Sequence, residues 1–198
     1  MDKSVLLTGH QEVAKFLERD FNQCFQQMRH YDGQILDICK FAFTAYTAIT
    51  GASLALYQYG RDKNINYSRP AASLFLIGLL IGSCLFAMLV RNRVYFVIVA
   101  RYVNEHRDYF LKGGTLDLKI QAPIYGPDEP SYFNWLSSQS LLLYVLAILN
   151  SVLLGLGLFL LFDSFLWITW LAFTASLILL SLQLIFAIRH LKSQGSKG

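Results

Sequence analysis

The residues best suited to chemistry lie close together in the stretch Arg101-Tyr-Val-Asn-Glu-His106. An arginine and a histidine stand five positions apart, with Asn104 between them and Glu105 next to the histidine. Histidine is the side chain most often used to move a proton in catalysis, and arginine stabilises developing negative charge. This stretch is therefore the candidate for acid–base chemistry, and the simpler alternative is a solvated helix face.

The spacing resembles the R-x4-6-H motif of HEPN-type ribonucleases, in which the histidine acts as acid or base and the arginine stabilises phosphate charge. The resemblance implies a ribonuclease site at Arg101 and His106. The stretch departs from that family at Tyr102, because the residue after the arginine is usually polar there. HEPN sites also form between two subunits of a soluble helical bundle. Since R-x4-H spacing arises often by chance, we expect no enzymatic activity and favour the solvated helix face.

Metal and nucleotide chemistry has no motif in this sequence. His30 and Asp32 lie close together without a third ligand at metal spacing, and Cys24, Cys39 and Cys84 form no C-x-x-C pair. There is no P-loop, G-x-G-x-x-G, H-E-x-x-H or G-x-S-x-G. Acidic and basic residues are balanced within each polar segment, so no basic patch points to nucleic acid. We therefore expect no metal, no cofactor and no direct nucleic-acid partner.

The elements that carry these residues are set by four long apolar runs. They contain no Lys, Arg, Asp or Glu, and they cover approximately Phe41–Tyr59, Ala71–Val90, Leu141–Phe162 and Phe165–Ile188. About 20 helical residues, at 1.5 Å each, cross a hydrocarbon core of roughly 30 Å. The sequence therefore predicts an all-α integral membrane protein, a four-helix bundle with four transmembrane helices in the lipid bilayer.

The distribution of basic residues predicts the orientation of this bundle. Of the 17 Lys and Arg residues, only Arg61, Lys63 and Arg69 lie between the first two spans, and none lies between the last two. The other basic residues lie on the side of the two termini. Because short loops rich in Lys and Arg stay in the cytoplasm, we expect a multi-pass protein of the cell inner (plasma) membrane with both termini cytoplasmic.

One face of the N-terminal segment is apolar at helical spacing. Its residues recur at alternating steps of four and three, and they are Leu17, Phe21, Cys24, Met28, Tyr31, Ile35 and Ile38. Such a stripe is a seam for another helix. The occupant is either the helix that follows the second span, another subunit, or a soluble cytoplasmic partner. The remaining alternative is a helix that lies on the membrane surface.

The chain is expected to divide into five parts. These are a cytoplasmic amphipathic helix (1–38), a first transmembrane hairpin with a helical cytoplasmic extension (39–112), a cytoplasmic loop (113–138), a second transmembrane hairpin (139–190) and a disordered tail (191–198). The second span runs on into the extension because 91–112 contains no Gly or Pro. The segment Val94–Val103 is so apolar that the N-terminal helix or a neighbouring subunit must cover it.

The loop is interpreted as a solvated connector with one short strand. Leu116, Leu118 and Ile120 alternate with polar residues, which favours a strand. Proline and glycine then interrupt any regular element as far as Pro130.

Small and polar residues within the spans indicate how helices meet. Gly78 and Gly82 form a G-x-x-x-G pair, and Ser151 and Gly155 form a similar one, so these positions are expected to pack against other helices. Asn150 and Gln183 either line a pore or hydrogen-bond a neighbouring helix. The absence of an ionisable residue at mid-depth argues against a proton-coupled transporter. A small channel or transporter subunit remains an alternative.

The layout of residues 10–112 resembles that of the SLATT group of prokaryotic antiviral defence proteins. The shared outline is a cytoplasmic helix, two spans joined by a short turn, and a helical extension. The last two spans of this chain depart from that two-span plan. The resemblance implies a homo-oligomer that permeabilises or depolarises the inner membrane when a soluble partner signals infection. We predict a non-enzymatic effector or membrane anchor with a soluble cytoplasmic protein partner; a membrane-tethered ribonuclease is the second alternative.

Overall fold

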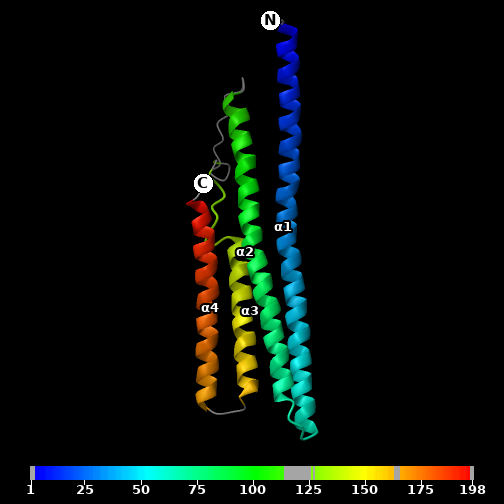
Figure 1. Cartoon of the computed structure of the whole chain (residues 1–198), viewed down its shortest axis with the longest axis vertical. Helices are drawn as coiled ribbons and strands as arrows, with labels where there is room; N and C mark the ends of the chain where they lie inside the picture. Colours follow the sequence, from blue (N-terminus) through cyan, green and yellow to red (C-terminus); the bar gives the residue numbers. More distant parts are fainter. Residues whose placement is uncertain (1–2, 114–125, 127, 163–165, 197–198) are drawn as a thin grey trace. The chain divides into compact units, whose positions relative to one another are not determined.

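The computed structural model is all-α, as predicted, and describes residues 3–113, 126, 128–162 and 166–196 (Figure 1). For residues 3–11, 109–113 and 166 it describes the backbone alone. Within this part of the chain there are four helices, which are α1 (Lys3–Asp62), α2 (Ser68–Gly113), α3 (Ser138–Leu161) and α4 (Leu166–Gly195).

Three of these helices are long and apolar enough to cross a membrane. The corresponding stretches are Ser68–Asp108, Ser138–Leu161 and Trp167–Gly195. The fourth predicted span, Phe41–Tyr59, is the second half of α1 and falls outside this set. Its threonines, together with Gly51 and Gln58, lower the mean hydropathy of this run. Length and composition thus support three spans, and the fourth stays a prediction.

The chain forms two compact units. Unit 1 contains Met1–Gln34 and Arg93–Tyr132, and unit 2 contains Ile35–Asn92 and Phe133–Gly198. The predicted amphipathic helix and the first apolar run form one continuous α1. No proline occurs in α1 to interrupt it. Both α1 and α2 therefore contribute residues to both units.

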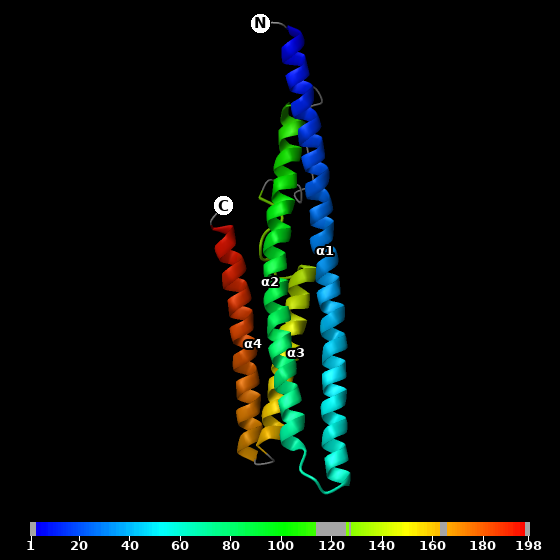
Figure 2. The same ribbon diagram turned by 45° about the vertical axis from the view of Figure 1, so that its right-hand side comes forward.

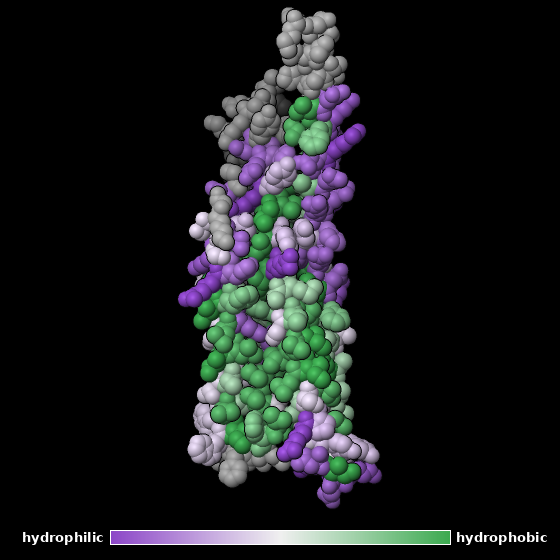
Figure 3. Space-filling model, viewed as in Figure 1, coloured by the Kyte–Doolittle hydropathy of each residue, from purple (hydrophilic) through white to green (hydrophobic). Residues whose placement is uncertain are grey.

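In unit 2, α3 and α4 lie side by side and antiparallel in both ribbon views (Figures 1 and 2). Leu143, Ala147 and Leu153 of α3 are buried. Many other large apolar side chains remain exposed, and only 17% of the most apolar stretch of α4 is buried. On the face shown in Figure 3, hydrophobic side chains gather over the middle of unit 2. Apolar surface on this scale calls for a lipid or protein neighbour.

The turn between α1 and α2 depends on a close approach at Gly60 and on the backbone conformation of Asn64. The amide of Ile65 donates to the carbonyl of Gly60 at 2.8 Å. A Cβ on Gly60 would lie 2.6 Å from the backbone carbonyl oxygen of Ile65, so only glycine fits at this position. Asn64 adopts a positive φ of 56°, a conformation that asparagine accepts more readily than most residues. The sharp turn keeps the loop short, as the sequence predicted for this end of the hairpin.

The predicted disordered tail was wrong for 191–195, because α4 continues to Gly195 and Leu191 is buried in unit 2. The predicted strand at Leu116–Ile120 lies outside the described residues.

Candidate functional site

The candidate site is the contact between α1 and α2 in unit 1, where the predicted apolar seam lies. Leu17, Phe21, Cys24, Met28 and Tyr31 are half-buried, whereas most other positions of α1 between 12 and 34 are exposed. The ring of Tyr31 stacks on that of Tyr95 with centroids 5.9 Å apart, and the Arg107 guanidinium lies 5.7 Å from the Phe21 ring centre. The chain's own α2 therefore contacts this stripe, for which the sequence also allowed another subunit or a soluble partner. Ile35 continues the stripe and is buried in unit 2.

A polar cluster crosses this contact at Asp20. The Tyr102 hydroxyl donates to Oδ2 of Asp20 at 2.8 Å, and Nε2 of His106 lies 3.5 Å from the same oxygen. The other ring nitrogen of His106 is 3.0 Å from the Tyr102 carbonyl oxygen, and the two rings meet edge to face at 4.3 Å. Sequence reasoning did not select Asp20. The available signal was a carboxylate three residues after Leu17 and four before Cys24, which places it beside the seam on the same side of the helix.

The catalytic pair considered from the sequence is not assembled by this contact. Arg101 Nε donates to the Pro130 carbonyl at 3.3 Å, and its guanidinium lies 4.7 Å from the Tyr132 ring centre. His106 instead contacts Asp20 of α1. Five helical positions separate the two side chains by about 140° around the axis. Each side chain has a different partner in this arrangement, so the geometry gives the ribonuclease alternative no support.

A second polar contact in unit 1 holds Gly126 and residues 128–132 against α2. Arg93 donates from Nη2 to the Ser131 carbonyl at 2.6 Å and from Nε to the Tyr132 carbonyl at 3.2 Å. Asn104 donates from Nδ2 to the carbonyls of Glu129 at 2.7 Å and Gly126 at 3.2 Å. Both donors are buried, with exposed fractions of 7% and 4%.

The interpretation of the loop as a solvated connector was therefore wrong for this segment. Pro130 and the irregular backbone around it leave carbonyl groups without partners in a helix or sheet. Buried carbonyl groups need donors, and the polar side chains of α2 supply them. The signal that could have predicted this contact is the spacing of Arg93, Arg101 and Asn104, which recur on one side of an otherwise apolar helix.

Replacing Asn104 with alanine is expected to release this segment from α2. The change removes two partly buried hydrogen bonds, to the carbonyls of Gly126 and Glu129, and each is worth about 1 kcal/mol. Hydrogen exchange of residues 128–132 should become several-fold faster. Glu105→Ala is the matched control, because Glu105 is exposed on the same helix. Equal exchange in both variants would mean that Asn104 does not hold the segment.

The thiol of Cys24 reports on the same α1–α2 contact. Burial raises the pKa of Cys24 above its usual value, and the negative charge of Asp20 raises it further. Only the thiolate reacts with maleimides, so we expect Cys24 to react more slowly than an exposed cysteine at neutral pH and to speed up as the pH rises. Asp20→Asn should accelerate the reaction. Mass spectrometry of maleimide-treated protein measures the rate, and an unchanged rate in Asp20→Asn would contradict the assigned environment.

In unit 2, the predicted small and polar residues meet at one crossing of three helices. The Tyr46 hydroxyl of α1 donates to Oδ1 of Asn150 of α3 at 2.7 Å. Gly82 of α2 faces this bond, since a Cβ there would overlap both Oδ1 of Asn150 and the Tyr46 hydroxyl. A Cβ on Gly78 would lie 3.1 Å from Ile49 and 3.3 Å from Leu153. The G-x-x-x-G pair thus brings α2 close to α1 and α3 within unit 2.

Asn150 and Gln183 lie inside unit 2, with exposed fractions of 0% and 8%. A pore between copies of the chain would not be lined by side chains that face the interior of one copy. Asn150 instead takes the second role considered for it, an interhelical hydrogen bond. Its Nδ2 and the Oε1 of Gln183 have no hydrogen-bond partner within the described part of the chain.

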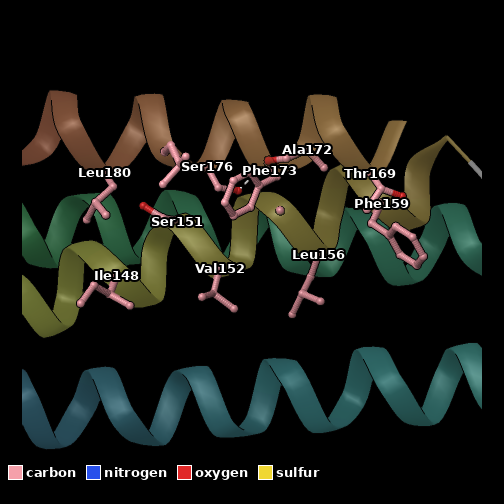
Figure 4. A pocket seen from close by; sticks show the side chains of 12 residues that line it. Ile148, Ser151, Val152, Leu156, Phe159, Thr169, Ala172, Phe173, Ser176 and Leu180 are labelled. Atoms are coloured by element: carbon pink, nitrogen blue, oxygen red, sulfur yellow. Dashed lines mark hydrogen bonds between the residues drawn. The ribbon is translucent and has the colours of Figure 1, made fainter. Parts of the chain in front are cut away.

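Ser151 and Gly155 of α3 border an open apolar groove against α4, about 390 Å³ in volume (Figure 4). A Cβ on Gly155 would lie 2.7 Å from the Ser176 hydroxyl, so glycine allows the close approach. The hydroxyls of Ser151 and Ser176 donate to carbonyls of their own helices, at Ala147 and Ala172. The two serine hydroxyls therefore use their donor within their own helix and offer the groove only acceptor lone pairs.

Comparison with protein-family models, curated proteins and solved structures found no match to this chain. Within the described residues, no group of three or more His, Cys, Asp or Glu side chains is placed to hold a metal ion. Any assignment of function therefore depends on the geometry and surface chemistry of the two units.

Proposed function

We propose that this chain is a multi-pass inner-membrane protein without enzymatic activity, which forms homo-oligomers and anchors a soluble cytoplasmic partner. The observation that carries the proposal is the contrast between the exposed side chains of the two units. The proposal assigns unit 2 to the bilayer and unit 1 to the cytoplasm.

The bilayer assignment rests on the exposed apolar side chains of α3 and α4. α3 contains no charged residue, and α4 contains none before Arg189. Leu171, Ile178 and Leu182 of α4 are more than half exposed. Water would disfavour this surface by about 25 cal/mol for each Å² left uncovered, whereas lipid chains accept it.

The partner assignment rests on apolar side chains exposed in unit 1. Ile98 of α2 is exposed at 47%, and Tyr95 and Tyr102, which flank it at i−3 and i+4, keep 39% and 41% of their surface exposed although they also contact α1. Val13 and Phe16 of α1 are exposed at 57% and 67%. Hydrophilic side chains are common on the face of this unit shown in Figure 3. Apolar residues at this spacing fit an amphipathic helix of another protein.

The homo-oligomer is supported by a face of small residues on α1 in unit 2. Ala48, Gly51, Ala52 and Ala55 are exposed there, and a Cβ on Gly51 would meet nothing within 4 Å. Small residues on an exposed membrane helix allow a second helix to approach closely. If another copy covers this face, the face does not contact lipid. α1 can then be less apolar than the other three helices.

Photo-crosslinking tests the partner proposal. A photoreactive residue at Ile98 should crosslink a distinct cytoplasmic protein, and one at the exposed Gln27 of α1 should not. Alkaline carbonate extraction of the same membranes should leave the chain in the pellet. Extraction into the supernatant would contradict the membrane assignment, and crosslinks that are equal at both positions would contradict the partner surface.

A second candidate function is a membrane effector that depolarises the cell, as the layout resemblance to the SLATT group implies. The observation that favours it is that the α1 face also exposes Thr44 and Thr47, whose hydroxyls donate to Lys40 and Phe43 of their own helix. Several copies of α1 could line a pore with this face. Membrane potential and dye entry should then change on expression with neighbouring genes, and Ala52→Leu should abolish the change. An intact potential in every combination would leave the anchor as the function.

A further inference from the structure

The exposed face of α4 changes from apolar to basic near its C-terminal end. Ile178, Leu182, Ile185 and Phe186 are exposed at 48–60%, and the next exposed side chains on this face, beginning one turn later, include Arg189 and Lys192. α4 contains no Asp or Glu, and α3, packed beside it, contains no charged residue. Neither basic residue takes part in an ion pair within the described part of the chain.

The opposite end of the same face carries tryptophans. Trp167 and Trp170 are exposed at 75% and 67%. Arg189 follows Trp170 by 19 residues, which is about 29 Å along an α-helix. This length matches the roughly 30 Å hydrocarbon core of a bilayer. Tryptophan favours the interface between lipid chains and headgroups, so this spacing places Arg189 and Lys192 at the level of the headgroups in the other leaflet.

The phosphate group of a lipid is a suitable ligand for the side chains at this end of α4. A guanidinium can donate two parallel hydrogen bonds to phosphate oxygens, and an ammonium adds a compact positive charge. The exposed Phe186 ring stacks on His190 with centroids 5.7 Å apart, and it adds apolar surface directly below the two cations. A free phosphate ion would use the charges alone, whereas a phospholipid would use the apolar surface as well.

We propose that the C-terminal end of α4 binds the headgroups of anionic phospholipids and prefers them to zwitterionic lipids. The proposal rests on the proposed function, since it requires unit 2 to lie in the bilayer. Each basic residue near an anionic lipid surface strengthens binding by about fivefold, so the pair provides up to roughly 30-fold. The cytoplasmic leaflet carries such lipids, and the binding would favour the predicted orientation of the chain.

The test compares lipid selectivity in phosphatidylcholine vesicles that contain the full chain. Spin-labelled phosphatidylglycerol or spin-labelled phosphatidylcholine is added, and the motionally restricted fraction gives the relative association of each lipid. The full chain should prefer phosphatidylglycerol, and the double variant R189Q/K192Q should lose most of that preference. High salt should reduce the preference, and inorganic phosphate at the same ionic strength should reduce it no further than chloride.

The control is R61Q/K63Q, which removes two exposed basic residues at the opposite end of unit 2. It should keep the preference. An unchanged preference in R189Q/K192Q, or an equal loss in the control, would overturn the lipid site. Carbonate extraction of the same vesicles separates the two proposals: chain that stays in the membrane without lipid preference overturns only the site, and chain that is extracted overturns both.

Discussion

Replacing Gly82 with valine is expected to lower the free energy of unfolding of unit 2 by about 2–6 kcal/mol. The new Cβ would overlap Oδ1 of Asn150 and the Tyr46 hydroxyl, so the hydrogen bond between them must break. A buried polar group left without a partner costs about 1–3 kcal/mol, and overpacking adds about 1–3 kcal/mol. Asn150 is fully buried and its Nδ2 already has no hydrogen-bond partner within the described residues, so its side chain would also lose the hydrogen bond from Tyr46.

Unfolding in mixed micelles, followed by far-UV circular dichroism, measures this effect. The matched control is Gly51→Ala, which changes a glycine in the first apolar run where a Cβ meets nothing within 4 Å. Alanine has the higher helix propensity by up to about 1 kcal/mol, so the control should be neutral or more stable. Wild-type stability of Gly82→Val would show that α2 does not approach α1 and α3 at this point.

Replacing Leu17, Phe21 and Met28 together with glutamate should separate α1 from α2 in unit 1. All three side chains are half-buried on the seam, and the Phe21 ring also lies beneath Arg107. Each change removes apolar contact worth about 1 kcal/mol and brings a charge to a partly buried position that disfavours it. The few polar contacts around Asp20 are too weak to offset this loss.

Hydrogen exchange should become at least about tenfold faster over residues 17–31 and 95–107, since a tenfold change corresponds to about 1.4 kcal/mol. The control variant carries the same three charges at Asn22, Gln26 and Gln27, which are exposed. Size-exclusion chromatography and partner pull-down on the same samples show whether the seam also serves assembly. Unchanged exchange in the seam variant would mean that α2 does not cover the seam.

The two variants also separate the roles of the two units. Gly82→Val acts within unit 2 and should leave the hydrogen exchange of residues 17–31 unchanged, because its contacts are all with residues of unit 2. The seam variant acts within unit 1 and should leave carbonate extraction unchanged. Loss of partner binding in the seam variant alone would support unit 1 as the partner-binding unit.

The sequence by itself determined that the chain is helical and that three of its four charge-free runs belong to helices apolar enough to cross a membrane, while the fourth, Phe41–Tyr59, stays a prediction. Charge-free runs of about 20 residues leave no other stable arrangement in lipid, since the backbone must satisfy its own hydrogen bonds there. The steps of four and three from Leu17 to Tyr31 likewise predicted which side of α1 is covered. These are local properties, because the period of a helix fixes which residues share a face.

The tertiary structure alone decided which of these residues touch. Gly51 and Gly82 both lie in apolar runs, yet only Gly82 faces another helix closely. The segment at Glu129 lies against Asn104, 25 residues earlier, and Asn150 meets Tyr46, 104 residues earlier. Arg101 and His106, adjacent in the sequence pattern, turn toward different neighbours. Sequence periodicity assigns a face to each side chain, but only the packing of helices brings particular side chains together.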